Sequence, residues 1–309
     1  MMSWTDFSQD RVLEMFSLSR STFFGWYDLQ GKLLLPVDRK PKNLKTVLSS
    51  EVNSVVQYRL LHRDVGYRKL TWMMIDEGVA CLTESTVYAI LKSHNMLFGW
   101  NGVTGTETKK EYTDKPKHVH DHWHTDIAYI KIQGIFYFLI MVLDGYSRYL
   151  LGWELMTDML GKSVENFIAQ VKEKYPHAKP KLIHDNGGQF ISTDFKRLIS
   201  NLEIQQIRTR RNHPQTNGKI ERMNGTVKNE AIRPNYPTDY QEACHYLNEY
   251  NYIYNHQRLH AGINFLRPAD VFFQRDQVIL KERSTKLEIA KHNRIQLNKL
   301  ELRNELTLH

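Results

Sequence analysis

The residues of this sequence best placed to do chemistry are three carboxylates, Asp126, Asp185 and Glu221, with 35 residues between the last two. Carboxylates that converge on one point repel one another unless divalent cations neutralise them, and oxygen ligands without His or Cys suit Mg²⁺ or Mn²⁺. Two such ions can activate a water or hydroxyl on one side of a phosphodiester and stabilise the leaving oxygen on the other. The pattern therefore indicates in-line cleavage or transfer of a phosphodiester, with two Mg²⁺ ions per site as the expected cofactor and Mn²⁺ as a substitute.

Local patterns indicate which elements must hold these carboxylates. Asp126 lies in an expected strand at 124–130, and Asp185 ends a short apolar run at 182–185, just before a turn. Glu221 belongs to an expected helix at 217–228, because apolar residues recur there at i, i+3 and i+7, namely Ile220, Met223 and Val227. Two strand ends and one helix would therefore form the site.

Four motifs surround the three acids, in the segments 123–130, 143–148, 184–190 and 213–224. In type and order they resemble the insertion-sequence transposases of the retroviral-integrase superfamily, whose catalytic core is an RNase H-like domain with an Asp, Asp, 35-residue gap, Glu signature. The resemblance is strong from about Trp123 to Pro268 and looser in the N-terminal third. It implies that Asp126 bridges two metal ions, while Asp185 holds one of them and Glu221 the other.

The expected elements follow the order that this resemblance requires. The fold class is α/β, an RNase H-like mixed five-stranded sheet flanked by helices and preceded by all-α helix-turn-helix domains. The elements are an antiparallel meander of strands at 123–130, 135–143 and 148–155, a helix at 161–175, a strand that ends at 185, a helix at 193–201 and a strand at 204–207.

Two helical pairs precede the core and are typical of helix-turn-helix units. The first pair is expected at 10–16 and 21–27, and the second at 67–78 and 84–92, each with Ser or Thr capping residues before its second helix. A generic helical hairpin would have the same pattern. The position of both pairs ahead of a nuclease-like core favours DNA reading, and in the family such modules read terminal inverted repeats.

Charge points to a nucleic-acid partner, because 42 Lys and Arg against 34 Asp and Glu give a net charge of +8. A run of charge is usually a solvated face, but the basic residues gather around Glu221 and in the linker between the helical pairs, which favours phosphate contact. The expected DNA-binding residues are Arg20, Ser21, Arg39, Lys40, Lys42, Ser85, Arg210, Arg211, His213, Lys219, Arg222 and Lys228.

Composition changes along the chain suggest the domain boundaries. We expect a helix-turn-helix with a basic linker at 1–47, a second helix-turn-helix at 48–100, a polar linker at 101–117, the catalytic core at 118–235, a helical extension at 236–275 and a charged tail at 276–309. The tail is read either as a helix for subunit contact or as a partly ordered arm.

Other features are better explained by structure or exclude a class of protein. The alternating His118, His120, His122 and His124 could imitate a metal site but lack a complete ligand shell, and Asp144 reads as a turn residue. We expect His184 to point away from the face of Asp185. The Tyr-rich helix expected at 239–255 reads as core packing rather than as a base-stacking platform. Two cysteines are too few for a disulfide framework or a Cys₂His₂ zinc site.

With no apolar run of 18 residues and no secretory signal, we expect no membrane contact and an intracellular location, cytoplasmic and nucleoid-associated in a bacterium. The expected function is that of a DNA transposase, which cleaves transposon ends and transfers the 3′-OH into target DNA. Its partners would be double-stranded DNA, both terminal inverted repeats and target, and further copies of itself. The alternatives are a transposase-derived DNA-binding regulator without nuclease activity, and a non-specific nuclease, which would leave the N-terminal modules unexplained.

Overall fold

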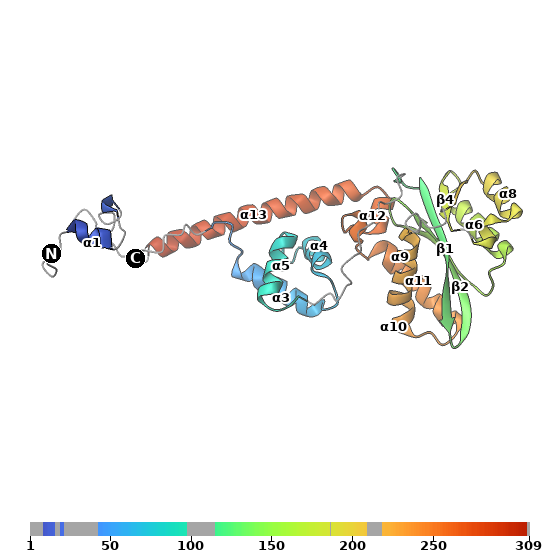
Figure 1. Cartoon of the computed structure of the whole chain (residues 1–309), viewed down its shortest axis with the longest axis horizontal. Coiled ribbons are helices and arrows are strands. Elements are labelled where there is room, and N and C mark those ends of the chain that lie inside the picture. Colours follow the sequence, from blue (N-terminus) through green and yellow to red (C-terminus); the bar gives the residue numbers. More distant parts are fainter. Residues whose placement is uncertain are drawn as a thin grey trace. The chain divides into compact units, whose positions relative to one another are not determined.

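The computed structural model describes residues 9–15, 19–21, 43–97, 115–185, 187–208 and 218–307 (Figure 1). The chain divides into two compact units, one made of residues 1–48 with 291–309 and the other of residues 49–290. Helix α13 (Asp276–Thr307) contributes to both, so the expected charged tail is helical. No helix in the described ranges has both the length and the apolarity to span a membrane.

In the smaller unit, α1 (Gln9–Met15) confirms the first expected helix. Arg20 donates two hydrogen bonds to the Asp10 carboxylate, at 2.8 and 2.6 Å. The Ser21 hydroxyl lies 2.9 Å from that of Ser19. Beyond Ser21, the second expected helix at 21–27 lies outside the described residues, and so do Arg39, Lys40 and Lys42.

The larger unit begins with a three-helix module, α3 (Ser49–Leu61), α4 (Tyr67–Glu77) and α5 (Glu84–Ser93). The sequence predicted α4 and α5 but not α3. The turn between α4 and α5 begins at Gly78, whose φ of 72° lies in the left-handed region that glycine tolerates. At the start of α5, the Thr83 side chain accepts the backbone N–H of Thr86. The apolar interior of the module is completely buried and consists of Val55, Leu70, Met74, Ile75, Val87 and Leu91.

The catalytic-core region is a mixed five-stranded sheet, as the sequence predicted, with strands in the order β3-β2-β1-β4-β5. β1 and β2 pair antiparallel, as do β2 and β3, whereas β4 is parallel to both β1 and β5. The strands are β1 (His122–Ile132), β2 (Ile135–Asp144), β3 (Leu150–Met156), β4 (Lys181–His184) and β5 (Gln205–Arg208).

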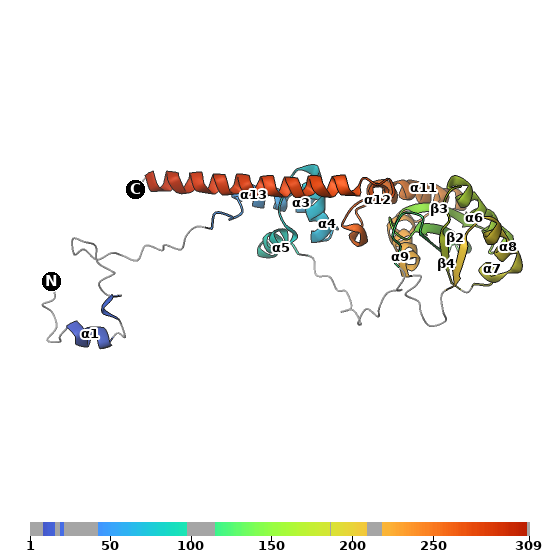
Figure 2. The ribbon, with the colours of Figure 1, turned by 90° about the horizontal axis from the view of Figure 1, so that it is seen from above.

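Helices cover both faces of this sheet (Figures 1 and 2). On one face, α9 and α11 pack over a cluster that includes Ala128, Ile130 and Ile132 of β1. On the other face, α6 and α8 cover a cluster around Trp123. The helices of this region are α6 (Gly161–Lys174), α7 (Gly188–Ile191), α8 (Thr193–Asn201), α9 (Gly218–Val227), α10 (Arg233–Asn235), α11 (Tyr240–His256) and α12 (Pro268–Phe272), with a π-helical turn η2 (Lys228–Ile232) and a 3₁₀ turn η3 (Ala261–Ile263).

The turn between β2 and β3 is built around Asp144, which is fully buried. Its carboxylate accepts the backbone N–H groups of Ser147 and His120, at 2.7 and 2.8 Å, and the Ser147 hydroxyl at 2.6 Å. Arg148 follows with a φ of 65°. β3 therefore begins at Leu150, two residues later than the sequence predicted. Asp144 holds a turn, as its sequence setting predicted.

Gly145 in this turn leaves no room for a side chain. A Cβ there would lie 2.9 Å from His124 Nε2, 3.0 Å from His122 Cβ and 3.1 Å from the His122 carbonyl oxygen. The neighbours are a buried strand, so the turn itself would have to move.

We therefore expect Gly145→Ala to lower the free energy of unfolding by roughly 1–3 kcal/mol, the usual cost of overpacking. The control is Gly225→Ala in α9, where nothing lies within 4 Å of a new Cβ and where alanine should stabilise the helix by about 0.5–1 kcal/mol. Urea unfolding of both variants measures this. Equal midpoints for the two would contradict the proposed steric conflict.

Candidate active site

Parallel pairing of β1 with β4 brings Asp126 and Asp185 to the same edge. The last paired residues are His124 and Ile183, and each aspartate follows two residues later, Asp126 within β1 and Asp185 just after β4. Asp126 is on the face of β1 that carries Ala128, because side chains alternate along a strand. Asp185 is exposed, and its Oδ1 accepts the backbone N–H of Gly187 at 2.9 Å.

Helix α9 supplies the third carboxylate over the same face. Ile220, Met223 and Val227 are all buried against the sheet, as their helical spacing predicted. Glu221 therefore lies in the first turn of α9 with its side chain exposed at the edge of that buried stripe. An apolar stripe of this kind fixes the rotation of the helix, and with it the direction of Glu221.

Asp126 responds electrostatically to both of the other acids. Burial, together with the negative charges of Asp185 and Glu221, raises the pKa of Asp126 to about 6. Opposing hydrogen bonds, from the Ile127 backbone and from Asn224, hold the pKa below what burial alone would give. The three sequence-predicted carboxylates thus lie close enough to repel one another.

Asn224 is a site residue that the sequence analysis did not single out. Its side-chain amide donates a 2.8 Å hydrogen bond to Oδ2 of Asp126, and the side chain is buried. Asn224 follows Glu221 by three residues, so the two share a face of α9. That spacing was a signal in the sequence, and it would have placed Asn224 beside the carboxylates.

Lys219, which we expected to contact DNA, makes a contact within the protein. Its ammonium donates a 3.1 Å hydrogen bond to the carbonyl oxygen of Gly145. The start of α9 is thereby linked to the turn that follows β2. This bond supports the position of Glu221 two residues later.

His184 packs inside the protein, in line with the expectation that it faces away from Asp185. Its ring stacks on Phe190, with centroids 4.9 Å apart. Nδ1 contacts the carbonyl oxygen of Asp185, and Nε2 lies 2.8 Å from the Gln206 side-chain amide. A neutral ring with the proton on Nδ1 satisfies both contacts, which agrees with a pKa of His184 that burial lowers.

The four alternating histidines do not share one strand face. Only His122 and His124 belong to β1, and both are buried. His120 lies before the strand with a φ of 65°, and its Nδ1 accepts the indole N–H of Trp123 at 3.1 Å. His118 is exposed. The row therefore does not gather around a metal position.

The expected DNA-contacting residues have varied surroundings. Arg222 is exposed beside Glu221, whereas Lys228 is half-buried and begins η2. The predicted α-helix thus ends at Val227, and the i+7 extrapolation from Glu221 to Lys228 crosses a change of helix type. Ser85 belongs to the cap of α5, where its hydroxyl lies 3.0 Å from that of Thr83. Arg210, Arg211 and His213 lie outside the described residues.

Positive charge also gathers near the end of α11, which the sequence analysis did not predict. Burial and the nearby Arg148, Arg258 and Arg222 lower the pKa of His260 to about 4. The imidazole is therefore neutral at neutral pH, and its Nδ1 accepts the N–H of Gly262 at 3.1 Å. Arg148, Arg222 and Arg258 are far apart in the sequence, and all three act electrostatically on the uncharged His260 ring.

One of these arginines anchors η2. Arg258 donates two hydrogen bonds to the carboxylate of Glu230, at 2.8 and 2.7 Å, and the Tyr250 hydroxyl donates a third at 2.8 Å. Glu230 lies in η2, which continues directly from α9. The ion pair consequently ties the end of the Glu221 helix to α11.

The carboxylate set can be compared with the needs of a metal ion. Within the described ranges, no three His, Cys, Asp or Glu side chains surround a single point closely enough to hold one ion. The donors at the site are all oxygens, and burial together with the charges of Asp185 and Glu221 raises the pKa of Asp126. This donor set fits hard cations that each take two carboxylates and complete their shells with water and phosphate oxygens.

Comparison with known families identifies the class. Residues 116–214 match the integrase core domain, and residues 202–268 match a second family of the same description. These spans contain the whole sheet, Asp126, Asp185 and Glu221. Residues 116–268 of the chain therefore form an integrase core domain.

The chain is also similar to curated proteins of insertion sequence elements, and it spans 59% of the first of them. It is 28% identical over 151 residues to the transposase for insertion sequence element IS904 of Lactococcus lactis, covering 48% of this chain and 59% of that protein. It is 24% identical over 278 residues to the 31 kDa protein of insertion element IS600 of Shigella sonnei, covering 84% of this chain and 96% of that protein.

Among solved structures, the chain is similar to the HTLV-2 integrase catalytic core domain in complex with magnesium. The identity is 18%, the TM-score is 0.41, and the match covers 51% of this chain and 99% of that one.

The Glu230–Arg258 pair gives a pH-dependent prediction. Burial pushes the pKa of Glu230 up, but Arg258 and Tyr250 outweigh it, and the net pKa is lowered from its ordinary 4.5. A lowered carboxyl pKa stabilises the fold above the ordinary pKa, and the gain disappears as the pH falls through the lowered value. We expect Glu230→Gln to reduce the free energy of unfolding by about 0.5–1 kcal/mol at pH 7, a small effect because the Glu230 side chain is 41% exposed and solvent screens the pair, and by progressively less below pH 4.5.

Urea unfolding across this pH range tests the Glu230 prediction. Glu249→Gln is the matched control, because Glu249 is exposed and pairs only with the exposed His245 of the same helix. A Glu230→Gln deficit that stayed constant with pH would rule out the ion pair as its source.

Proposed function

We propose that the chain is a DNA transposase that cleaves the ends of an insertion sequence and joins the freed 3′-OH to target DNA. The observation that carries this proposal is that Asp126 in β1, Asp185 just after β4 and Glu221 in α9 lie on neighbouring elements of an integrase core. Such a set of oxygen donors suits metal-assisted phosphoryl transfer.

Asp126, Asp185 and Glu221 would hold two Mg²⁺ ions, with Asp126 shared between them and Mn²⁺ as a substitute. When bound, such ions would activate the attacking water or 3′-OH and neutralise charge on the leaving oxygen. The raised pKa of Asp126 supports this assignment, because a carboxylate crowded by two others gains most from a nearby cation.

The remaining residues of the site would keep the carboxylates in position. Asn224 holds one oxygen of Asp126, which leaves the other oxygen available for a ligand. Lys219 secures the start of α9 against the turn at Gly145. The Glu230–Arg258 pair secures its far end. Glu221 would thus approach substrate from a helix restrained at both ends.

The partner would be double-stranded DNA. Arg222 is exposed, follows Glu221 directly in α9 and would contact backbone phosphates. The module α3–α5, and the helical pair that begins with α1, would read the terminal inverted repeats, because sequence is read by side chains presented in a groove. Joining two ends in concert would require at least two copies of the chain.

The carboxylate assignment is tested by Asp126→Asn, Asp185→Asn and Glu221→Gln. Each should abolish Mg²⁺-dependent cleavage and strand transfer and leave binding of end DNA unchanged within about twofold, because the carboxylates act in chemistry and the helical modules in recognition. Cleavage and gel-shift assays on one labelled DNA separate these effects.

Asp194→Asn serves as the control for these variants, since Asp194 is an exposed carboxylate in the first turn of α8. Retained cleavage in any one site variant would remove that residue from the active site. A wild-type chain that binds the ends but never cuts them would instead support a DNA-binding regulator.

Salt titration tests the proposed phosphate contacts. Arg222→Ala and Lys228→Ala should each weaken DNA binding and reduce the slope of log K against log salt by about 0.9, the value for one lost phosphate contact on duplex DNA. Lys196→Ala in α8 is the control, because that exposed lysine is on the opposite face of the sheet. An unchanged slope for Arg222→Ala or Lys228→Ala would assign that side chain to the solvated surface.

A further inference from the structure

The guanidinium of Arg283 makes four hydrogen bonds within the protein, although this residue belongs to the charged tail. Its side chain is only 4% exposed. It donates two hydrogen bonds to the Asp76 carboxylate, at 2.7 and 2.6 Å, and two more to the carbonyl oxygens of Asn264 and Phe265, at 3.1 and 2.9 Å. Four of the five N–H donors of the guanidinium are thus used.

These bonds join two parts of the larger unit. Asp76 lies at the end of α4 in the three-helix module, whereas Asn264 and Phe265 follow η3 in the integrase core region. Asn264 and Phe265 have φ values of 57° and 53°, a left-handed backbone that is uncommon for residues other than glycine. This backbone presents two successive carbonyl oxygens to one arginine, which indicates a loop shaped around the contact.

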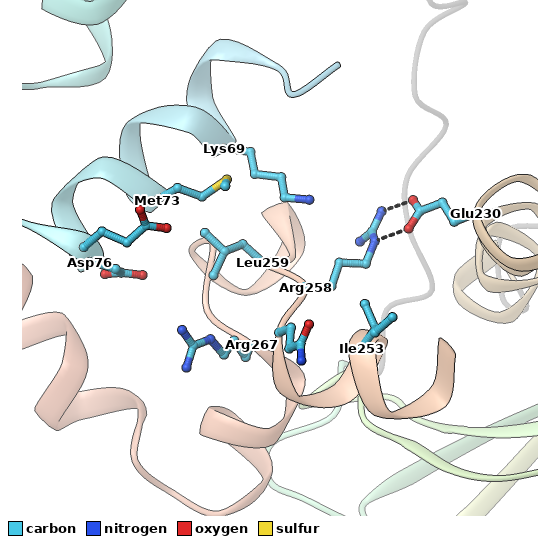
Figure 3. Close-up of a pocket in the computed structure, with 10 residues that line it drawn as sticks. Lys69, Met73, Asp76, Glu230, Ile253, Arg258, Leu259 and Arg267 are labelled. Carbon is cyan, nitrogen blue, oxygen red and sulfur yellow. Dashed lines mark hydrogen bonds and ion pairs between the residues drawn. The ribbon is translucent and has the colours of Figure 1, made fainter. Parts of the chain in front are cut away.

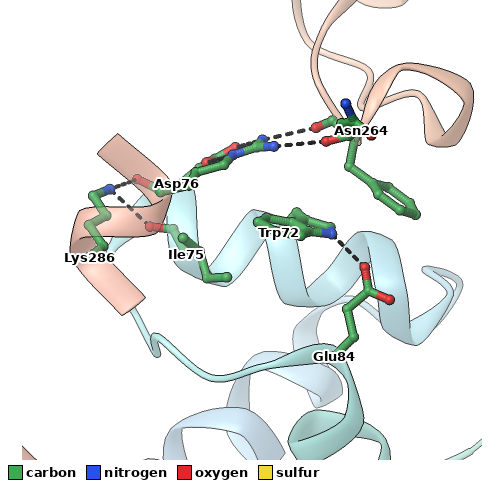
Figure 4. Close-up of polar contacts among 8 residues, drawn as sticks. Trp72, Ile75, Asp76, Glu84, Asn264 and Lys286 are labelled. Atoms are coloured by element: carbon green, nitrogen blue, oxygen red, sulfur yellow. Dashed lines mark hydrogen bonds and ion pairs between the residues drawn. The ribbon is translucent and has the colours of Figure 1, made fainter. Parts of the chain in front are cut away.

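Aromatic packing extends the contact toward α5. The Arg283 guanidinium lies 4.9 Å from the centre of the Trp72 ring, which also stacks on Phe265. The indole N–H of Trp72 donates a 2.7 Å hydrogen bond to Glu84, the first residue of α5 (Figure 4). A continuous set of contacts therefore runs from the core loop through Arg283 and Trp72 to the helix expected to read DNA.

Lys286 adds a second link from α13. Its ammonium donates to the carbonyl oxygens of Ile75 and Asp76, both at 2.9 Å, at the end of α4 (Figure 4). A cation there also complements the partial negative charge of a helix C-terminus. Because α13 follows directly from α12, which packs on the core, both links act between the module and the core.

Elsewhere the boundary between the module and the core is loosely filled. A cavity of about 270 Å³ lies there, lined by Lys69, Met73 and Glu77 of α4 and by Glu230, Arg258 and Arg267 of the core (Figure 3). This part of the boundary is therefore not closely packed, and the contacts of Arg283, Trp72 and Lys286 lie beside it.

We propose that Arg283 is a positioning residue that fixes the α3–α5 module on the integrase core and so sets which phosphate of the bound DNA end reaches the carboxylates. This inference rests on the proposed function, because it assumes that the module reads the end and that the core cuts it. A change in the position of the cut would reveal this role of Arg283. The rate of cutting should also fall, because a substrate displaced by about 1 Å can react on the order of 100-fold more slowly.

The test uses the full chain with duplex DNA that carries one end of its insertion sequence. We expect Arg283→Gln to bind this DNA within about twofold of wild type, because the module remains intact, and to cut on the order of tenfold to hundredfold more slowly, at several neighbouring phosphates instead of one. Lys281→Gln removes an exposed positive charge from the same helix and should cut as wild type does.

Hydrogen exchange supplies a readout that does not depend on cleavage. In Arg283→Gln, amides of residues 264–266 and the end of α4 should lose protection while the apolar interior of α3–α5 keeps it. Asp76→Asn removes the charge that Arg283 pairs with but keeps the shape of the side chain, so it should change both the cleavage pattern and hydrogen exchange in the same direction. It replaces Arg283→Gln as the test variant if Arg283→Gln fails to fold. A single wild-type cut with wild-type exchange in a folded variant would overturn the inference. Absence of cutting by the wild-type chain would count against the proposed function instead.

Discussion

The arrangement of this core depends on holding three like charges close together. Burial, with the charges of Asp185 and Glu221 added to it, raises the pKa of Asp126, so keeping that carboxylate charged in this position is unfavourable. The restraint comes from backbone pairing and apolar packing. β1 and β4 fix the two aspartates through the ladder, and a buried stripe fixes the rotation of α9. A stable scaffold carries this strained group of charges, as is usual at functional sites.

Polar contacts then hold the ends of the helices and strands around the carboxylates. Lys219 ties the start of α9 to the turn at Gly145, and Glu230 ties the following π turn to Arg258. Asn255 bonds both the N–H and the carbonyl of Leu150 at the start of β3, which joins α11 to the edge of the sheet. Lys219 comes from one of the four motifs around the carboxylates, whereas Glu230, Asn255 and Arg258 follow those motifs in the sequence. The framework around the carboxylates is therefore encoded over a longer part of the chain than the motifs.

Residues that act through local patterns could be predicted from the sequence, and residues that act through distant pairing could not. Strand alternation and the spacing of Ile220, Met223 and Val227 sufficed to place all three carboxylates on the elements found. The bond from Asn224 to Asp126 spans 98 positions, and that from Arg283 to Asp76 spans 207. Arg283 lies among residues of alternating charge, so the sequence pattern predicts a solvated side chain. Its burial follows from the contact with α4, which the local pattern does not indicate. The late start of β3 was hidden because it follows from the buried bonds of Asp144.

The π-helical turn after α9 has a geometric consequence for how this core can vary. Such a turn holds one residue more than an α-helical turn would, so losing one residue there would restore an α-helical turn and keep the chain on either side in phase. A single deletion between Lys228 and Ile232 would therefore leave Glu221 in place but move Glu230 relative to Arg258, so the length of this short segment is constrained by the ion pair and not by the helix. Insertions and deletions among related chains should therefore accumulate in the loops and avoid these five residues.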